Sequence, residues 1–232
     1  MHVAMLFDVF GTCVDWRTSV TREVAAVAKA KGVTLDAAAF ADAWRANYQP
    51  SMEVVRVGKR AYAPLDVLHR ETLVTLCAQY GLRLSEAETD ELNFAWHRLD
   101  PWRDTVAGLD RLRKRFILSP LSNGNVRLLV DMARRAKLPW DAVLSTEVFK
   151  AYKPQQQTYL GAAAMLGLPP EQVMMVAAHN SDLRHAQSHG LKTAFVARPT
   201  EYGPNQKIDL APDGDWTFVA RDFVHLAEML GC

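Results

Sequence analysis

Apolar and polar positions divide the chain into stretches of different periodicity. Residues 2–8 form a short apolar run that ends at Asp8, which predicts a buried β-strand. From about Trp16 to Trp96, apolar residues recur at helical spacing and no convincing strand pattern occurs. This stretch is therefore predicted to be an α-helical insertion. Helices are expected over 19–28, 37–57, 65–80 and 86–97.

Beyond residue 104, short apolar runs alternate with helical patterns. Such alternation is typical of parallel βαβ units, and so it predicts an α/β fold with a parallel sheet. The predicted domains are a core over 1–14 and 99–232, and an inserted helical cap over 15–98. Strands are expected over 116–121, 143–145, 173–177, 193–196 and 216–219, and helices over 105–115, 125–137, 156–166, 181–188 and 223–230.

The composition is ordinary for a globular protein, with 49% apolar and 23% charged residues among 232. The net charge is +1 and no basic block occurs, so nucleic acid is not an expected partner. No apolar stretch reaches roughly 18 residues, so no membrane span is expected. Cys13, Cys77 and Cys232 lack the spacing of a metal site, and their odd number argues against a disulfide framework. Together with an N-terminus that lacks a signal-peptide layout, this favours the cytoplasm.

Polar residues follow several predicted strand ends or occupy nearby loops. In parallel sheets the carboxyl ends of the strands meet at one edge, where ligands bind, so these residues are expected to converge. A carboxylate at such an edge can act as a nucleophile. Each group can also be explained structurally, as part of a turn or a helix cap. Only the order of the groups along the chain favours the hypothesis that they form one functional site. The groups are Asp8 with Thr12, Ser122 with Asn123, Lys153 with Pro154, and the segment His179-Asn180-Ser181-Asp182.

The order Asp-x-x-Gly-Thr, Ser-Asn, Lys-Pro and Asp resembles the haloacid dehalogenase superfamily over essentially the whole chain. The resemblance implies a Rossmann-like parallel-sheet core with the helical cap inserted. Most members are magnesium-dependent phosphatases whose motif has a second Asp that protonates the leaving group. Here that position is Phe10. A halide leaving group needs no proton, so displacement of a halide at carbon remains possible without this acid. Neither a metal nor another cofactor is expected.

Within the superfamily the chain looks most like the L-2-haloacid dehalogenases, whose motif has an aromatic residue at this position. Ala43-Trp44-Arg45 matches a cap helix whose arginine faces the halogen, and Tyr152-Lys153-Pro154, followed by Tyr159, matches the third motif. The sequence departs from the pattern where Ala177-Ala178-His179 replaces Ser-Ser-Asn. His179 can supply part of the missing water activation or be a structural hydrogen-bonding residue, and both readings stay open.

The resemblance implies hydrolysis of short (S)-2-haloacids to (R)-2-hydroxyacids, with inversion at C2 through an aspartyl ester. Asp8 would attack C2, and Thr12, Ser122 and Lys153 would orient Asp8 or hold the substrate carboxylate. Asp182, with help from His179, would activate the water that hydrolyses the ester. The implied contacts to substrate and halide are Phe10, Arg45, Ser122, Asn123 and Tyr159.

Two alternatives accompany this reading. One is a phosphatase-like hydrolase of the same superfamily with an atypical, acid-free motif. The other is a non-catalytic relative that binds a small acid, since a fold alone does not establish function. The expected partners are a small halogenated carboxylic acid and a halide ion, and a homodimer is expected from the resemblance alone.

Overall fold

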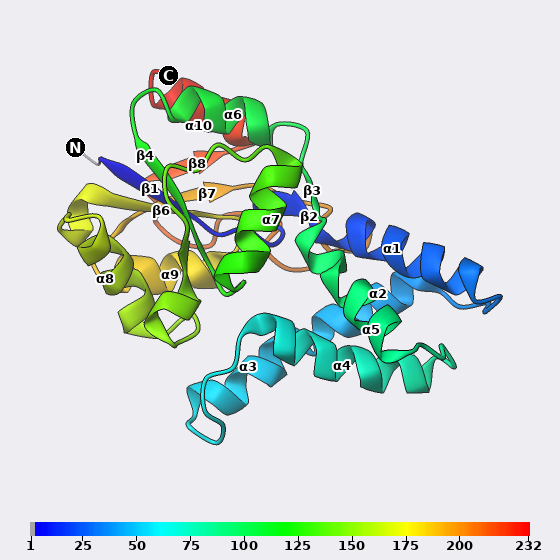
Figure 1. Cartoon of the computed structure of the whole chain (residues 1–232). Coiled ribbons are helices and arrows are strands. Elements are labelled where there is room, and N and C mark those ends of the chain that lie inside the picture. Colours follow the sequence, from blue (N-terminus) through cyan, green and yellow to red (C-terminus); the bar gives the residue numbers. More distant parts are fainter. Residues whose placement is uncertain (1–2) are drawn as a thin grey trace.

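A six-stranded parallel sheet forms the centre of the computed structural model, which describes residues 3–232 (Figure 1). The strand order is β5-β4-β1-β6-β7-β8, and every neighbouring pair is parallel. This confirms the predicted α/β class. The strands are β1 (Ala4–Phe7), β4 (Ile117–Ser122), β5 (Leu144–Ser145), β6 (Val173–Ala177), β7 (Lys192–Val196) and β8 (Phe218–Ala220).

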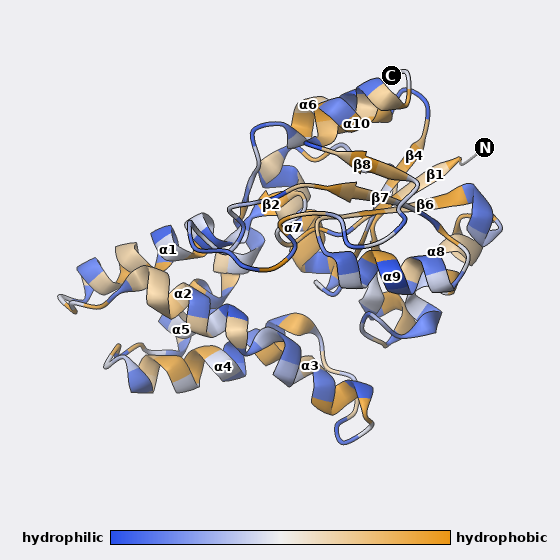
Figure 2. Cartoon of the chain, turned by 180° about the vertical axis from the view of Figure 1, so that it is seen from behind, coloured by the Kyte–Doolittle hydropathy of each residue, from blue (hydrophilic) through white to orange (hydrophobic). Residues whose placement is uncertain are grey.

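Helices cover both faces of this sheet because successive side chains of each buried strand point to opposite faces. Met5 and Phe7 of β1 pack with apolar residues of α6 (Thr105–Leu112), α7 (Val126–Ala136) and α10 (Phe223–Met229). Leu6 faces the other way, toward α8 (Gln156–Met165) and α9 (Asn180–Ser188). In Figure 2 the strands of the sheet are coloured largely as hydrophobic, whereas the helices carry hydrophilic residues on their outer sides.

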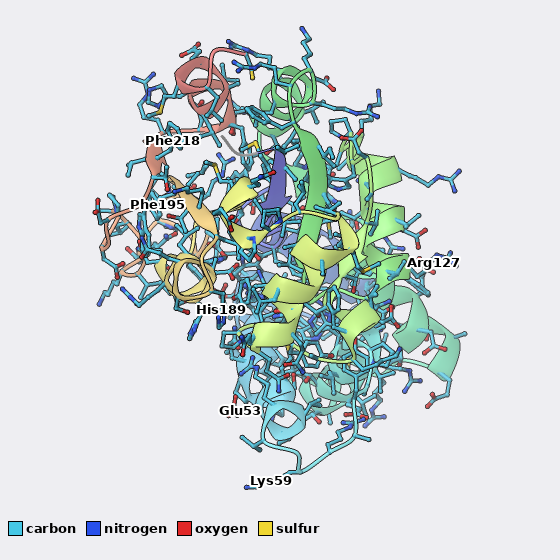
Figure 3. All side chains as sticks on the ribbon, turned by 90° about the vertical axis from the view of Figure 1, so that its left-hand side faces the viewer. Glu53, Lys59, Arg127, His189, Phe195 and Phe218 are labelled. Carbon is cyan, nitrogen blue, oxygen red and sulfur yellow. The ribbon has the colours of Figure 1, made fainter. Side chains whose placement is uncertain are left out.

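The remaining helices lie to one side of the sheet, where Figure 1 shows them as a separate group. They follow β2 (Val14–Asp15) and precede β3 (Asp100–Pro101), which pair antiparallel. Glu53 and Lys59 lie at the far end of this group from Phe218 of the sheet (Figure 3). We propose that they form the cap predicted over 15–98. The helices are α1 (Trp16–Ala30), α2 (Ala37–Ala46), α3 (Tyr48–Arg56), α4 (Leu65–Gln79), α5 (Glu86–Asn93) and a 3₁₀ turn, Phe94–His97.

The single helix predicted over 37–57 is wrong, because the chain breaks at Asn47 between α2 and α3. Pro50 explains the break, since proline has no N–H to donate to the carbonyl of Ala46 and its ring would clash there. Pro50 lies in the first turn of α3, where backbone N–H groups have no partner within the helix, so its missing N–H removes no hydrogen bond from α3. The Asn47 side chain donates instead to the carbonyl of Ala43, at 2.9 Å. The break turns the chain just after Arg45, the predicted halide ligand.

The strand order places the end of β1 at the point where the chain changes direction across the sheet. From β1 the chain continues to β4 and β5 on one side, and it then returns to β6 on the other side. Ligands bind in α/β proteins at such a crevice beyond the carboxyl ends of the strands. Asp8 directly follows β1 and occupies this position. Across residues 3–232, no helix is long and apolar enough to cross a bilayer.

Candidate active site

Asp8 is buried, and both of its carboxylate oxygens accept hydrogen bonds. Lys153 Nζ donates to Oδ1 at 2.9 Å, while the Thr12 hydroxyl, at 2.7 Å, and His179 Nδ1, at 3.0 Å, contact Oδ2. The Thr12 hydroxyl also accepts from the backbone N–H of Ala178, which fixes its orientation. Burial alone would raise the pKa of Asp8, but Lys153 and His179 outweigh it and hold that pKa well below its usual range. The carboxylate of Asp8 is therefore ionised near neutral pH.

Lys153 joins two carboxylates. Its Nζ donates to Asp8 and also to Asp182, whose other oxygen accepts the Tyr159 hydroxyl at 2.7 Å. Burial opposes the charge of Lys153, but the two carboxylates raise its pKa above the ordinary value. The ammonium group thus stays charged and separates two anions that would otherwise repel each other.

His179 has a second carboxylate partner that the sequence analysis did not identify. Its Nε2 lies 2.8 Å from Oε2 of Glu201, which is fully buried. The other oxygen of Glu201 accepts from Trp16 Nε1 at 3.0 Å. Burial opposes protonation of His179, but Glu201 and Asp8 together raise its pKa well above the ordinary value.

Gly11 makes room for this arrangement. Its φ of +83° lies in the region that glycine adopts without cost. A Cβ atom at this position would also lie 2.0 Å from Oε1 of Glu201. The glycine of the first motif is thus required twice, by the turn after Asp8 and by the carboxylate packed against it.

Arg45 projects from α2 toward the same site. Its guanidinium carbon lies 4.2 Å from the centre of the Tyr48 ring, and Nη2 lies 3.9 Å from Glu201. Nη1 is buried and has no hydrogen-bond partner among the described residues. Asn123 is oriented by the backbone N–H of Lys153, which donates to its Oδ1 at 2.8 Å. The amide nitrogen of Asn123 is thus the part left for a ligand. Both side chains offer donors to an anion.

A cavity of about 440 Å³ connects these groups. It brings together most of the predicted site residues, namely Asp8, Phe10, Arg45, Asn123, Lys153, Tyr159, His179 and Asp182. Thr12 does not line the cavity, but its hydroxyl donates to Asp8, which does. Ser122 does not line the cavity, and its hydroxyl accepts from the backbone N–H of Gly124 at 3.2 Å, so its predicted contact with the substrate stays a prediction.

Comparison with known proteins identifies the family. The family described as haloacid dehalogenase-like hydrolase matches residues 3–190. The chain belongs to this family. The resemblance stated from the sequence motifs is thereby confirmed.

Several relatives of this haloacid dehalogenase-like hydrolase carry more specific names. The solved structure of a defluorinating L-2-haloacid dehalogenase is 47% identical, with a TM-score of 0.98, over 100% of this chain and 96% of that one. Another L-2-haloacid dehalogenase structure is 48% identical, with a TM-score of 0.97, over 100% and 99% of the two chains. The (S)-2-haloacid dehalogenase 4A of Burkholderia cepacia is 30% identical over 86% of each chain.

The site of this hydrolase does not fit the magnesium ion that is common in its superfamily. Position 10, where phosphatase motifs carry a second acid, is Phe10, and it lines the cavity with an apolar ring. The carboxylates of Asp8 and Asp182 both bind Lys153, so an ammonium group already stands between them. Within residues 3–232, no group of three or more His, Cys, Asp or Glu side chains is arranged to hold a metal ion.

Glu201 is the main functional candidate that the sequence analysis missed. It lies in the long irregular segment between β7 and β8, where no apolar periodicity or strand end marks a position. Tyr202 follows it and lines the cavity. Nothing in the local pattern distinguishes Glu201 from a solvated surface acid, and only the fold brings it to His179. The other lining residues not predicted as site residues are Tyr48, Gln49, Pro154, Ser181, His185, Ile208 and Asp209.

Proposed function

We propose that this enzyme hydrolyses short (S)-2-haloacids to (R)-2-hydroxyacids through an ester on Asp8, with inversion at C2 and without a metal. The observation that carries the proposal is the buried Asp8, which is paired with Lys153 and lines the cavity together with Phe10. Asp8 and Phe10 supply a nucleophile but no acid for an alkoxide leaving group, which suits a halide. The names of the relatives, which are (S)-2- or L-2-haloacid dehalogenases, support the same activity.

In the first step Asp8 attacks C2 from the face opposite the halogen. A bond forms between a carboxylate oxygen and C2, and the electron pair of the carbon–halogen bond leaves with the halide. Negative charge thus moves from Asp8 to the halogen. Arg45 and the amide group of Asn123 offer donors for that charge, and such donors are worth most in a site that excludes water. The cavity wall formed by Phe10 and Tyr48 helps to exclude it.

In the second step water attacks the ester carbonyl carbon of Asp8. Asp182 accepts a proton from this water and passes it to the departing alkoxide, which leaves as the 2-hydroxyacid. Asp8 is then released as a carboxylic acid and loses its proton, because its pKa is low. Each turnover therefore yields one hydroxyacid, one halide and one proton. Lys153 and the Tyr159 hydroxyl hold Asp182 in place for its role.

Fluoride is included among the leaving groups that we propose. It is the smallest halide and the strongest hydrogen-bond acceptor, so it depends most on donors at the site of departure. The unpartnered Nη1 of Arg45 is such a donor. A defluorinating relative is 47% identical to this chain.

The enzyme is further proposed to act in the cytoplasm and to form a homodimer, as the cysteine pattern and the family resemblance predict. Size-exclusion chromatography with light scattering measures the second property directly. Neither property is needed for the chemistry proposed above.

A substrate panel tests the proposed function. Purified enzyme is incubated with chloroacetate, fluoroacetate and each enantiomer of 2-chloropropionate, with and without EDTA, and released halide is measured. We expect halide from both acetates and from the (S) enantiomer, unchanged by EDTA. Magnesium-dependent release of phosphate from p-nitrophenyl phosphate, without any halide release, would favour the phosphatase alternative. Saturable binding of a small acid without turnover would favour the non-catalytic one.

A further inference from the structure

His179 lies between two carboxylates, and this geometry defines its charge. Nδ1 is 3.0 Å from Asp8 Oδ2, and Nε2 is 2.8 Å from Glu201 Oε2. A carboxylate oxygen only accepts hydrogen bonds, whereas a neutral imidazole has one donor nitrogen and one acceptor nitrogen. Both contacts can be hydrogen bonds only when both ring nitrogens carry a proton. The ring geometry therefore corresponds to an imidazolium.

The formal charges of the site agree with this state. Asp8, Asp182 and Glu201 contribute three negative charges, whereas Lys153 and Arg45 contribute two positive charges. A neutral His179 would leave the site negative before an anionic substrate enters it. A charged His179 brings the sum over these six groups to zero; Asp209, which also lines the cavity, binds Asn180 instead.

Glu201 is built into this position rather than placed there by a mobile side chain. It is fully buried, accepts from Trp16 Nε1 at 3.0 Å and packs against the backbone of Gly11. The groups that face His179 are Asp8 at the end of β1, Glu201 and Tyr202 in the segment after β7, and Arg45 of α2 next to Glu201. Of these four groups, only Asp8 changes its charge during the proposed reaction.

We propose that His179 acts as an imidazolium that donates to Asp8 Oδ2 throughout the reaction, and that Glu201 is the positioning residue that keeps it protonated. This inference rests on the proposed ester mechanism and assigns His179 a role other than general base. Oδ2 has two donors, Thr12 and His179, whereas Oδ1 has one, Lys153. Oδ1 is therefore the oxygen that is freer to attack C2, and Oδ2 becomes the ester carbonyl oxygen.

Of the two reaction steps, ester hydrolysis therefore depends more strongly on His179 than ester formation does. When water adds to the carbonyl carbon, the electron pair of the C=O bond moves onto Oδ2. Thr12 and the imidazolium of His179 stabilise this oxyanion, as preorganised donors do in other acyl transfers. The proton of the water goes to Asp182, and the Cγ–Oδ1 bond breaks when the hydroxyacid leaves. His179 neither gains nor loses a proton in the cycle.

The test compares wild-type enzyme with Glu201→Gln, which keeps the shape and an acceptor oxygen but removes the charge. Nitrogen-15 NMR of labelled histidine follows the protonation of His179 in the resting enzyme, and single-turnover kinetics separate ester formation from ester hydrolysis. We expect both nitrogens of wild-type His179 to be protonated at pH 7. In Glu201→Gln we expect its titration and the alkaline limb of the kcat profile to move down by at least about one pH unit, with hydrolysis slowed more than ester formation.

The control is Glu71→Gln, which removes one negative charge from an ion pair with Arg60 on the surface of the cap helices. It should change neither the His179 titration nor the pH profile. A neutral His179 in the resting wild-type enzyme at pH 7, or an unshifted titration in Glu201→Gln, would overturn the inference. The wild-type NMR titration needs no substrate and remains decisive if Glu201→Gln does not fold. Absence of halide release would refute the proposed function, but the NMR titration of His179 would still test the protonation proposed for it.

Discussion

Two sides of the cavity are built in different ways. The lysine side consists of Asp8, Lys153, Tyr159 and Asp182, which are connected by direct hydrogen bonds. Asp8 directly follows a sheet strand, and the other three lie in or before the helices next to the sheet. The arginine side consists of Arg45 and His179, which line the cavity, and of Glu201, which contacts both but is fully buried. Arg45 comes from the cap helices and Glu201 from the long segment after β7.

The comparison separates what the fold supplies from what this chain adds. Strand ends of an α/β sheet always meet at one edge, so any member of the fold can place the lysine side there. The arginine side requires a cap at the right distance and an irregular segment that packs on Gly11. We therefore expect the lysine side to determine whether ester chemistry occurs, and the arginine side to determine which leaving group departs and how fast the ester is hydrolysed.

Substitution of Lys153 by methionine should have the largest effect. The variant leaves Asp8 and Asp182 buried without their shared cation, so the pKa of at least one carboxyl rises and the nucleophile is partly protonated. We expect kcat for halide release to fall by a factor on the order of 10³ or more. The free energy of unfolding should drop by about 3–5 kcal/mol, the usual cost of removing one partner of a buried ion pair. Urea denaturation and a halide assay measure both.

Lys59→Met is the matched control for this prediction, because Lys59 is exposed at the far end of the cap helices. It should leave both quantities close to wild type. A Lys153→Met enzyme with near-normal turnover would show that the lysine side does not control the nucleophile.

Arg45→Ala tests the arginine side and should have the next largest effect. A guanidinium donates hydrogen bonds and stays charged, so its loss removes stabilisation of the departing halide. We expect ester formation to slow by about 10²–10³, with hydrolysis of the ester affected less. The loss should be worst for fluoride and chloride and mildest for iodide. Rapid-quench kinetics across the halogen series provide the measurement, and equal losses for all halides would place Arg45 outside the halide site.

The sequence predicts the lysine side well and the arginine side only in part. Asp8 and Asp182 are predicted from the sequence because each lies at or just after the end of an apolar strand pattern, and Lys153 because it lies in a nearby loop in the order of the family's motifs. Arg45 is found only through its match to the Trp-Arg pair of a known family. Glu201 is not found, because an acid in an irregular segment has no periodicity that relates it to a residue far away in the chain.

The same distinction applies to the fold. Apolar periodicity places the strand over 173–177 at the bounds that the structure has for β6. It fails over 37–57, where the apolar pattern continues through Asn47 although Pro50 ends the hydrogen-bond ladder of α2. Periodicity reports which face is buried, and it does not report whether the backbone can continue.

The dependence of stability on pH should show a smaller effect that belongs to the arginine side. His179 has a raised pKa in the folded state, so its stabilisation is complete below its unfolded pKa of about 6.5 and is lost as pH rises through the folded value. Asp8 acts in the opposite direction, because its lowered pKa adds stability that is present above its unfolded pKa of about 3.9 and is lost as pH falls below that value. We expect the wild-type free energy of unfolding to fall with rising pH above about 6.5, by at most about 1.4 kcal/mol per pH unit.

Chemical denaturation at a series of pH values above about 6.5, repeated with His179→Asn, isolates the contribution of His179 to the pH dependence of stability. The variant is expected to be less stable at neutral pH but to lack the alkaline decline that His179 causes. An identical pH dependence in the two proteins would assign the decline to other groups.

Isotope labelling in a single turnover tests the central claim, that Asp8 forms an ester with the substrate, most directly. Enzyme in excess over (S)-2-chloropropionate is allowed to react in H₂¹⁸O, and both the hydroxyacid and the peptide containing Asp8 are analysed by mass spectrometry. Water attacks the carbonyl carbon of the ester in the proposed mechanism, so the label should enter the carboxylate of Asp8 while the lactate carries an unlabelled oxygen from the enzyme. Label in the lactate during the first turnover, with none in Asp8, would mean direct attack of water on C2 and would contradict the account.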